Sequence, residues 1–150
     1  DKMQKRLEDD GLDKNVLFAK AGDYFDTLDS IEDGSVDAVL DVESLICNDF
    51  DRTREIIKKI FNKLKAGGKF ISITFADGTW GLGGKEHSHH LVIPTEGPMA
   101  NEGTVRYTTK EDISNLYKLD NNKIEKIERQ DYHFEDGHML KEWVIELTKI

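Results

Sequence analysis

The stretch that most constrains the fold runs from Gly34 to Phe75, where two β-prone segments flank a helical one. Its first segment, Val36–Val42, is short and largely apolar, which is typical of a strand buried on both faces of a parallel sheet. Apolar residues then recur at helical spacing over Ile56–Leu64. The last segment, Lys69–Phe75, alternates polar and β-prone residues. Strand, crossover helix and strand form one right-handed βαβ unit, so the pattern predicts an α/β fold.

Other segments extend this unit in both directions along the chain. Asn15–Lys20 is short and apolar and predicts one more strand before the unit. Gly67 and Gly68 are expected to end the helix, because glycine accepts the left-handed conformation needed there. Lys123–Phe134 and Glu142–Ile150 are β-prone and flank a hairpin turn. The chain therefore combines parallel strands with a C-terminal antiparallel hairpin.

Composition excludes several classes of protein. The 150 residues fit one domain, and the net charge of −9 argues against nucleic acid as a partner, because phosphate neutralisation needs clustered Lys and Arg. No apolar run approaches the length of a membrane span, so we expect no membrane partner. The single cysteine fits a reducing compartment, and we therefore expect a cytoplasmic location.

Three short motifs together resemble the class I S-adenosylmethionine-dependent methyltransferases. Gly34–Leu40 is similar to the family's fourth strand, and Leu64–Phe70 is similar to the entry to its fifth strand. Ala21–Tyr24 resembles the turn that contacts adenine, and the three motifs occur in the family's order and spacing. The resemblance implies a Rossmann-like mixed sheet closed by the hairpin, and a methyltransferase with S-adenosylmethionine as its cofactor.

The resemblance places five residues at the cofactor, namely Gly22, Asp23, Tyr24, Asp41 and Val42. In open α/β sheets, ligands bind outside the C-terminal ends of the strands, and Asp23 follows an expected strand there. Its carboxylate is placed to accept a hydrogen bond from the exocyclic amine of adenine, and the N–H of Tyr24 is placed to serve a ring nitrogen. The alternative is that Asp23 only caps the short helix that follows it.

The candidate catalytic residues are Asp41, Glu43 and His89. Asp41 and Glu43 are two apart, so both point to the same side if the strand persists, and either carboxylate can orient a substrate or take a proton. The alternative is that they begin a solvated loop or cap the next turn. His89 is a candidate general base near the methyl acceptor.

Residues 77–104 show no clear periodicity, and we interpret them as a lid or substrate loop over the ligand edge of the sheet. Trp80, His87 and His90 within it are candidate substrate contacts. Arg106, just past it, is placed to clamp an anionic substrate group, although surface polarity explains it almost as well. The histidines of this segment are metal-ligand types, but one short cluster fixes too few ligands, so a structural or solvated segment is favoured over a metal site.

The family's Gly-rich turn and its ribose-binding carboxylate have no counterpart in these 150 residues. The chain also opens inside an expected helix at Asp1. We therefore interpret residues 1–150 as a partial methyltransferase domain, a fragment whose front strands are missing. We expect it to be inactive alone, to bind cofactor weakly or not at all, and to self-associate through unpaired sheet edges.

Three functions remain open at this point, and a metal-binding lid domain is the third of them. The first is methyl transfer, in the parent protein, to a small-molecule or protein acceptor. The second is a non-catalytic binding or regulatory module that reuses the methyltransferase fold.

Overall fold

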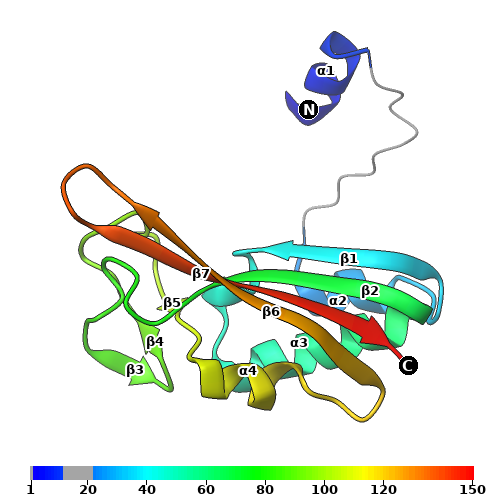
Figure 1. Cartoon of the computed structure of the whole chain (residues 1–150). Coiled ribbons are helices and arrows are strands. Elements are labelled where there is room, and N and C mark those ends of the chain that lie inside the picture. Colours follow the sequence, from blue (N-terminus) through cyan, green and yellow to red (C-terminus); the bar gives the residue numbers. More distant parts are fainter. Residues whose placement is uncertain (1, 12–21) are drawn as a thin grey trace.

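The computed structural model describes residues 2–11 and 22–150 (Figure 1). The helices are α1 (Lys2–Asp9), α2 (Tyr24–Asp29), α3 (Phe50–Lys63) and α4 (Lys110–Tyr117), with a 3-10 turn, η1, at Leu45–Cys47. The strands are β1 (Val36–Val42), β2 (Leu64–Phe75), β3 (Glu86–Ser88), β4 (Leu91–Val92), β5 (Val105–Arg106), β6 (Asn122–His133) and β7 (Met139–Lys149). The strand predicted at Asn15–Lys20 lies outside the described residues. Within the described ranges, no helix is both long and apolar enough to cross a bilayer.

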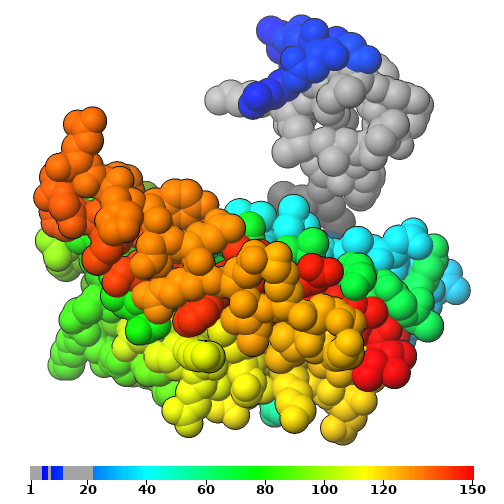
Figure 2. All heavy atoms as spheres, in the orientation of Figure 1, coloured from blue at the N-terminus to red at the C-terminus, as the bar shows by residue number. Residues whose placement is uncertain are grey.

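Among the described residues, the main sheet has four strands in the order β1-β2-β7-β6. β1 pairs with β2 in parallel, whereas the other two pairs are antiparallel. The βαβ unit and the C-terminal hairpin predicted from the sequence are both confirmed, and the sheet is mixed as the resemblance implied. Figure 2 shows the β6–β7 hairpin, in orange, projecting beyond the body of the molecule at one end.

Three helices, α2, α3 and α4, pack on one face of this sheet (Figure 1). α3 begins where the side chain of Asp49 accepts a hydrogen bond from the Arg52 backbone N–H at 2.8 Å, which satisfies a donor that the helix leaves open. The buried residues shared by α3, α4, β2 and β7 include Ile56, Ile57, Ile60, Phe61, Phe70, Leu116, Tyr117, Ile145 and Leu147. Each such side chain stabilises the fold by roughly 1.5–3 kcal/mol through its burial.

The other face of β1 is open, contrary to the prediction of a strand buried on both faces. Leu40 is 65% exposed and Val42 is 53% exposed, while Asp41 between them is buried. β1 is the end strand of the described sheet, and no described helix covers this face. The apolar sequence of β1 predicts that both faces of the strand are covered, but it does not indicate which segment covers each face.

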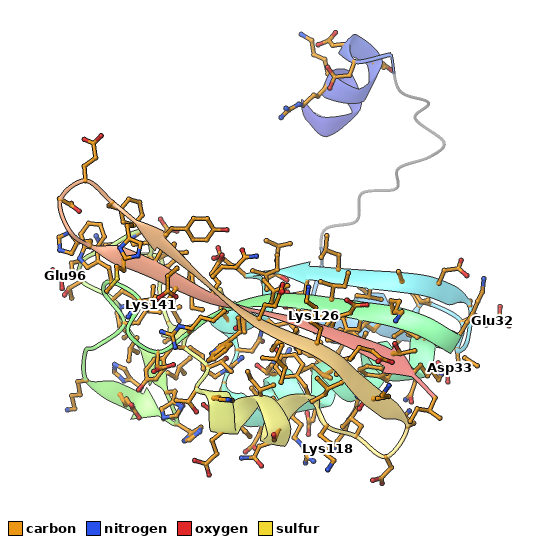
Figure 3. All side chains as sticks on the ribbon, viewed as in Figure 1. Glu32, Asp33, Glu96, Lys118, Lys126 and Lys141 are labelled. Carbon is orange, nitrogen blue, oxygen red and sulfur yellow. The ribbon has the colours of Figure 1, made fainter. Side chains whose placement is uncertain are left out.

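The segment after β2 is more ordered than its lack of periodicity predicted. Strands β3, β4 and β5 form a second, antiparallel sheet in that order, joined to β2 through the bridge between Ala76 and Thr108. Val92 and Val105 of this sheet are buried in one hydrophobic cluster with Ile46, Phe75 and Leu82. Strands of two or three residues are too short to produce a readable alternation. In Figure 3, Glu96 of this segment lies at one end of the molecule and Glu32 and Asp33, before β1, lie at the other.

Gly67 and Gly68 do not end the helix as predicted. α3 ends one turn earlier, at Leu64, whose extended backbone (φ −67°, ψ 142°) starts β2 directly. Both glycines therefore lie within β2. Gly67 has φ +77°, and Gly68 passes close to the neighbouring strand where the β1–β2 register shifts. The two glycines thus allow the irregular pairing of β1 with β2 at this point.

Gly68→Ala tests this close approach. A Cβ at Gly68 would lie 2.8 Å from the carbonyl oxygen of Lys65 and 3.1 Å from that of Asp37, both backbone atoms. We expect the free energy of unfolding in urea to fall by about 1–3 kcal/mol. Gly83→Ala is the matched control, because nothing lies within 4 Å of its Cβ. Equal stability of the two variants would show that the backbone around Gly68 shifts to accept a Cβ at little cost in free energy.

Candidate functional site

A rim forms where the start of α2 meets the end of β1. The hydroxyl of Tyr24 donates to the carbonyl oxygen of Ser44 at 3.0 Å, and the Ser44 hydroxyl donates to Asp41 Oδ1 at 2.5 Å. An apolar hollow of about 140 Å³ opens here; Tyr24, Thr27, Leu28, Val39, Leu40, Asp41, Ser44, Leu45, Ile56 and Ile60 line it. The structure therefore brings Tyr24 and Asp41 together at the C-terminal end of β1.

Asp41 is 5% exposed and both of its carboxylate oxygens accept hydrogen bonds. Oδ1 accepts from the backbone N–H groups of Ser44 and Leu45 at 3.2 Å each, as well as from the Ser44 hydroxyl. Oδ2 accepts a hydrogen bond from the Ser72 hydroxyl at 2.7 Å. The same Ser72 hydroxyl lies 3.0 Å from the Tyr117 hydroxyl. Asp41 therefore caps the turn that follows β1, which was the alternative to a catalytic role in the sequence analysis.

Asp23 also caps a helix. Its Oδ1 accepts from the Phe25 backbone N–H at 2.8 Å, and its Oδ2 pairs with Arg52 Nη2 at 2.7 Å. The carboxylate is partly exposed, so capping α2 does not close it to a ligand. Gly22 before it and Val42 at the end of β1 are exposed as well. The Asp23 carboxylate can therefore cap α2 and still be reached by a ligand such as adenine.

Glu43 does not share a face with Asp41, because β1 ends at Val42 and Glu43 takes a left-handed backbone with φ +50°. This conformation is uncommon for a residue other than glycine. Glu43 turns toward Glu142 of β7, and burial together with that neighbouring carboxyl raises the pKa of Glu43 to about 8. Sequence analysis missed Glu142, since only strand pairing brings it here.

His89 and His90 converge on Asp112, at the start of α4. His89 Nε2 lies 2.7 Å from Asp112 Oδ1, and His90 Nδ1 lies 2.7 Å from Oδ2. Burial acts to raise the pKa of Asp112, but hydrogen bonds from both histidines and from Thr109 outweigh it and the pKa falls to about 2. His87 stays apart, exposed on β3. Sequence analysis missed Asp112, although its place three residues after the cap Thr109 was a readable signal.

The other two candidate substrate residues separate in the fold. Trp80 packs on the β6–β7 hairpin, stacked on His138 with ring centroids 3.9 Å apart. Arg106 is 1% exposed, which rules out surface polarity as its explanation. Its Nη1 donates to Thr108 Oγ1 at 2.8 Å, while Nε and Nη2 have no hydrogen-bond partner among the described residues. Burial lowers the pKa of the Arg106 guanidinium.

Several solved structures to which this chain is similar are S-adenosylmethionine-dependent methyltransferases. One from Methanosarcina mazei has a TM-score of 0.65 at 19% identity, over 81% of this chain and 62% of its own. One from Mesorhizobium loti has a TM-score of 0.65 at 13% identity, over 99% of this chain and 76% of its own.

A third similar structure holds ligands. This 1,6-didemethyltoxoflavin-N1-methyltransferase from Burkholderia thailandensis, with bound 1,6-didemethyltoxoflavin and S-adenosylhomocysteine, has a TM-score of 0.57 at 15% identity. The match covers 81% of this chain and 48% of that one, so the chain spans less than two thirds of the length of several relatives. No protein-family profile and no curated protein matches the sequence. The chain thus has the class I methyltransferase fold, as the resemblance implied.

Replacing Arg106 tests whether its buried donors lack partners. Arg106→Met removes a desolvated cation and keeps most of the side-chain length, so we expect the free energy of unfolding to rise by roughly 1–3 kcal/mol. Arg129→Met is the control, because Arg129 pairs with Asp77 and Asp131 and should show no gain. A loss of stability in Arg106→Met would mean that all the donors of Arg106 are satisfied.

The raised pKa of Glu43 predicts a pH dependence of stability. The folded pKa of about 8 lies above the ordinary 4.5, so the folded protein holds this proton more tightly than the unfolded chain. Stability from this group is fully present below pH 4.5 and is lost as the pH rises toward 8. We expect the Tm to fall over this range less steeply in Glu43→Gln than in the wild type. Glu32→Gln, on an exposed loop, should keep the wild-type slope; a Glu43→Gln slope equal to it would refute the assignment.

Proposed function

We propose that this chain is part of an S-adenosylmethionine-dependent methyltransferase domain and supplies the adenine side of the cofactor site and the lid over the acceptor. The observation that carries the proposal is the Tyr24–Ser44–Asp41 link, which joins the start of α2 to the C-terminal end of β1. Ligands of open α/β sheets bind at that edge. The fold shared with methyltransferases supports the same reading.

The residues at the rim fit the adenine end of the cofactor. Leu28 and Leu40 give the hollow apolar walls for a flat ring, and Asp23 presents a partly exposed carboxylate to an amine. The N–H of Tyr24, in the first turn of α2, has no acceptor within the helix. S-adenosylmethionine, when bound, supplies an electrophilic methyl group. Residues outside these 150 would complete the site, because the Gly-rich turn is not among them.

We assign acid–base chemistry to Glu43. Methyl transfer to an O–H or N–H acceptor releases a proton. Glu43 accepts it in its ionised form, which forms as the pH approaches the raised pKa of about 8 and is a stronger base than an ordinary carboxylate. Asp41 has both oxygens engaged and therefore holds the rim in place. His89, the other candidate base, has its Nε2 committed to Asp112. In this proposal, Arg106 meets an anionic group of the acceptor once the lid opens, through Nε and Nη2, which have no partner among the described residues.

The remaining assignments rest on this proposal. The acceptor is a small molecule or a protein side chain, and the lid is residues 77–104. The location is cytoplasmic. The end strand β1, with exposed Leu40 and Val42, is the edge through which the isolated chain would self-associate.

Chemical-shift mapping of the labelled chain with S-adenosylhomocysteine tests the proposal. We expect weak binding, with shifts at Tyr24 and Ser44, because only part of the cofactor site is present. Asp23→Ala should weaken binding, whereas Asp26→Ala, an exposed position on the same helix, should not.

Two outcomes would contradict the proposal. Shifts confined to the β6–β7 hairpin would place the ligand elsewhere. Micromolar affinity of the 150 residues alone would contradict a partial site.

A further inference from the structure

Two imidazoles and a carboxylate converge on one point beside the lid. The three ligand atoms, from His89, His90 and Asp112, all lie within 4.8 Å of one another. The sequence offered only a short histidine cluster, and the fold adds the third ligand from α4. We propose that these residues bind a divalent transition-metal ion. This inference goes beyond the methyltransferase assignment and does not depend on it.

The backbone at His90 makes the convergence possible. Consecutive side chains of an extended segment point in opposite directions. His90 instead takes φ +55°, and its ring lies 3.9 Å from that of His89 with a tilt of 32°. Such a conformation is uncommon outside glycine and costs roughly 1–3 kcal/mol. The fold therefore holds both rings over Asp112 at the expense of local backbone strain.

The donor set suits a borderline transition metal. Zn²⁺ binds imidazole nitrogen and carboxylate oxygen at about 2.1 Å, and two His with one carboxylate is a recurrent set that leaves positions open. Ligands at that distance in a tetrahedral site stand about 3.4 Å apart. The nitrogen–oxygen separations are 2.7 Å for both His89 and His90. To hold an ion, each neutral imidazole would carry its proton on the ring nitrogen that faces away from Asp112, and each nitrogen would move about 0.7 Å farther from the carboxylate oxygen.

Neighbouring groups hold the ligands in place. Phe50 meets the His89 ring edge-on at 5.0 Å, and Tyr107 stacks on the His90 ring at 4.6 Å. The Tyr107 hydroxyl in turn donates to Glu86 Oε1 at 2.6 Å. Thr109 donates to Asp112 Oδ2 through its backbone N–H and its hydroxyl, each at 2.8 Å. Contacts of this kind orient metal ligands and raise the affinity of a site.

The site is open to solvent on the side of His89, whose side chain is 54% exposed. A hollow of about 270 Å³ opens beside it; Asp49, Phe50, Asp51, Ser88 and His89 line it. Two of these residues are acidic, which favours the approach of a cation. Water or another ligand from this hollow completes the coordination.

Calorimetric titration of the whole chain with Zn²⁺ tests the proposal, after purification without a polyhistidine tag and removal of metal with a chelator. We expect one ion per chain with micromolar or tighter affinity. His89→Ala should weaken binding more than about tenfold. His87→Ala, two residues away on exposed β3, is the matched control and should bind as the wild type does.

Thermal unfolding gives an independent readout. Zn²⁺ should raise the Tm of the wild type and of His87→Ala but not that of His89→Ala or Asp112→Asn. Asp112→Asn also weakens the cap of α4, so its Tm without metal is the reference. Absence of binding by Zn²⁺ and Co²⁺ would overturn the proposal. An equal loss in His87→Ala would also overturn it, because the ion would then bind the histidine segment as a whole.

Discussion

The arrangement of the site depends on one buried carboxylate, that of Asp41. It accepts hydrogen bonds from two backbone N–H groups and from the hydroxyls of Ser44 and Ser72. These bonds fix the turn that leads from the end of β1 into η1. Its link through Ser72 to Tyr117 joins β1, β2 and α4. A buried carboxylate without such donors would be strongly destabilising, so these elements are fixed relative to one another.

The same turn connects the rim to the second sheet. Ile46 of η1 is buried with Phe75, Leu82, Val92 and Val105, so the second sheet packs directly on the turn that Asp41 holds. Tyr24 reaches the other side of that turn through the Ser44 carbonyl. The rim and the second sheet therefore both contact one short segment, and a disturbance of that segment would reach both.

Sequence periodicity was sufficient for the main sheet, because long elements repeat their pattern several times, as in α3 and β7. It failed where contacts join distant segments. Asp112 meets His90, and Glu142 meets Glu43, only after residues 77–104 fold and the strands pair. The burial of Arg106 could not be predicted from the sequence either. β5 is only two residues long, and a charged side chain in so short a strand is expected to face solvent.

The central claim is that the adenosine group binds at the rim between α2 and the end of β1. The most direct measurement is a crystal structure of the chain soaked in S-adenosylhomocysteine at high concentration. The account predicts the adenine amine within hydrogen-bond distance of the Asp23 carboxylate, with the ring in the hollow beside Leu40. A nucleoside bound at the opposite end of the sheet, near Glu32 and Asp33, would contradict it.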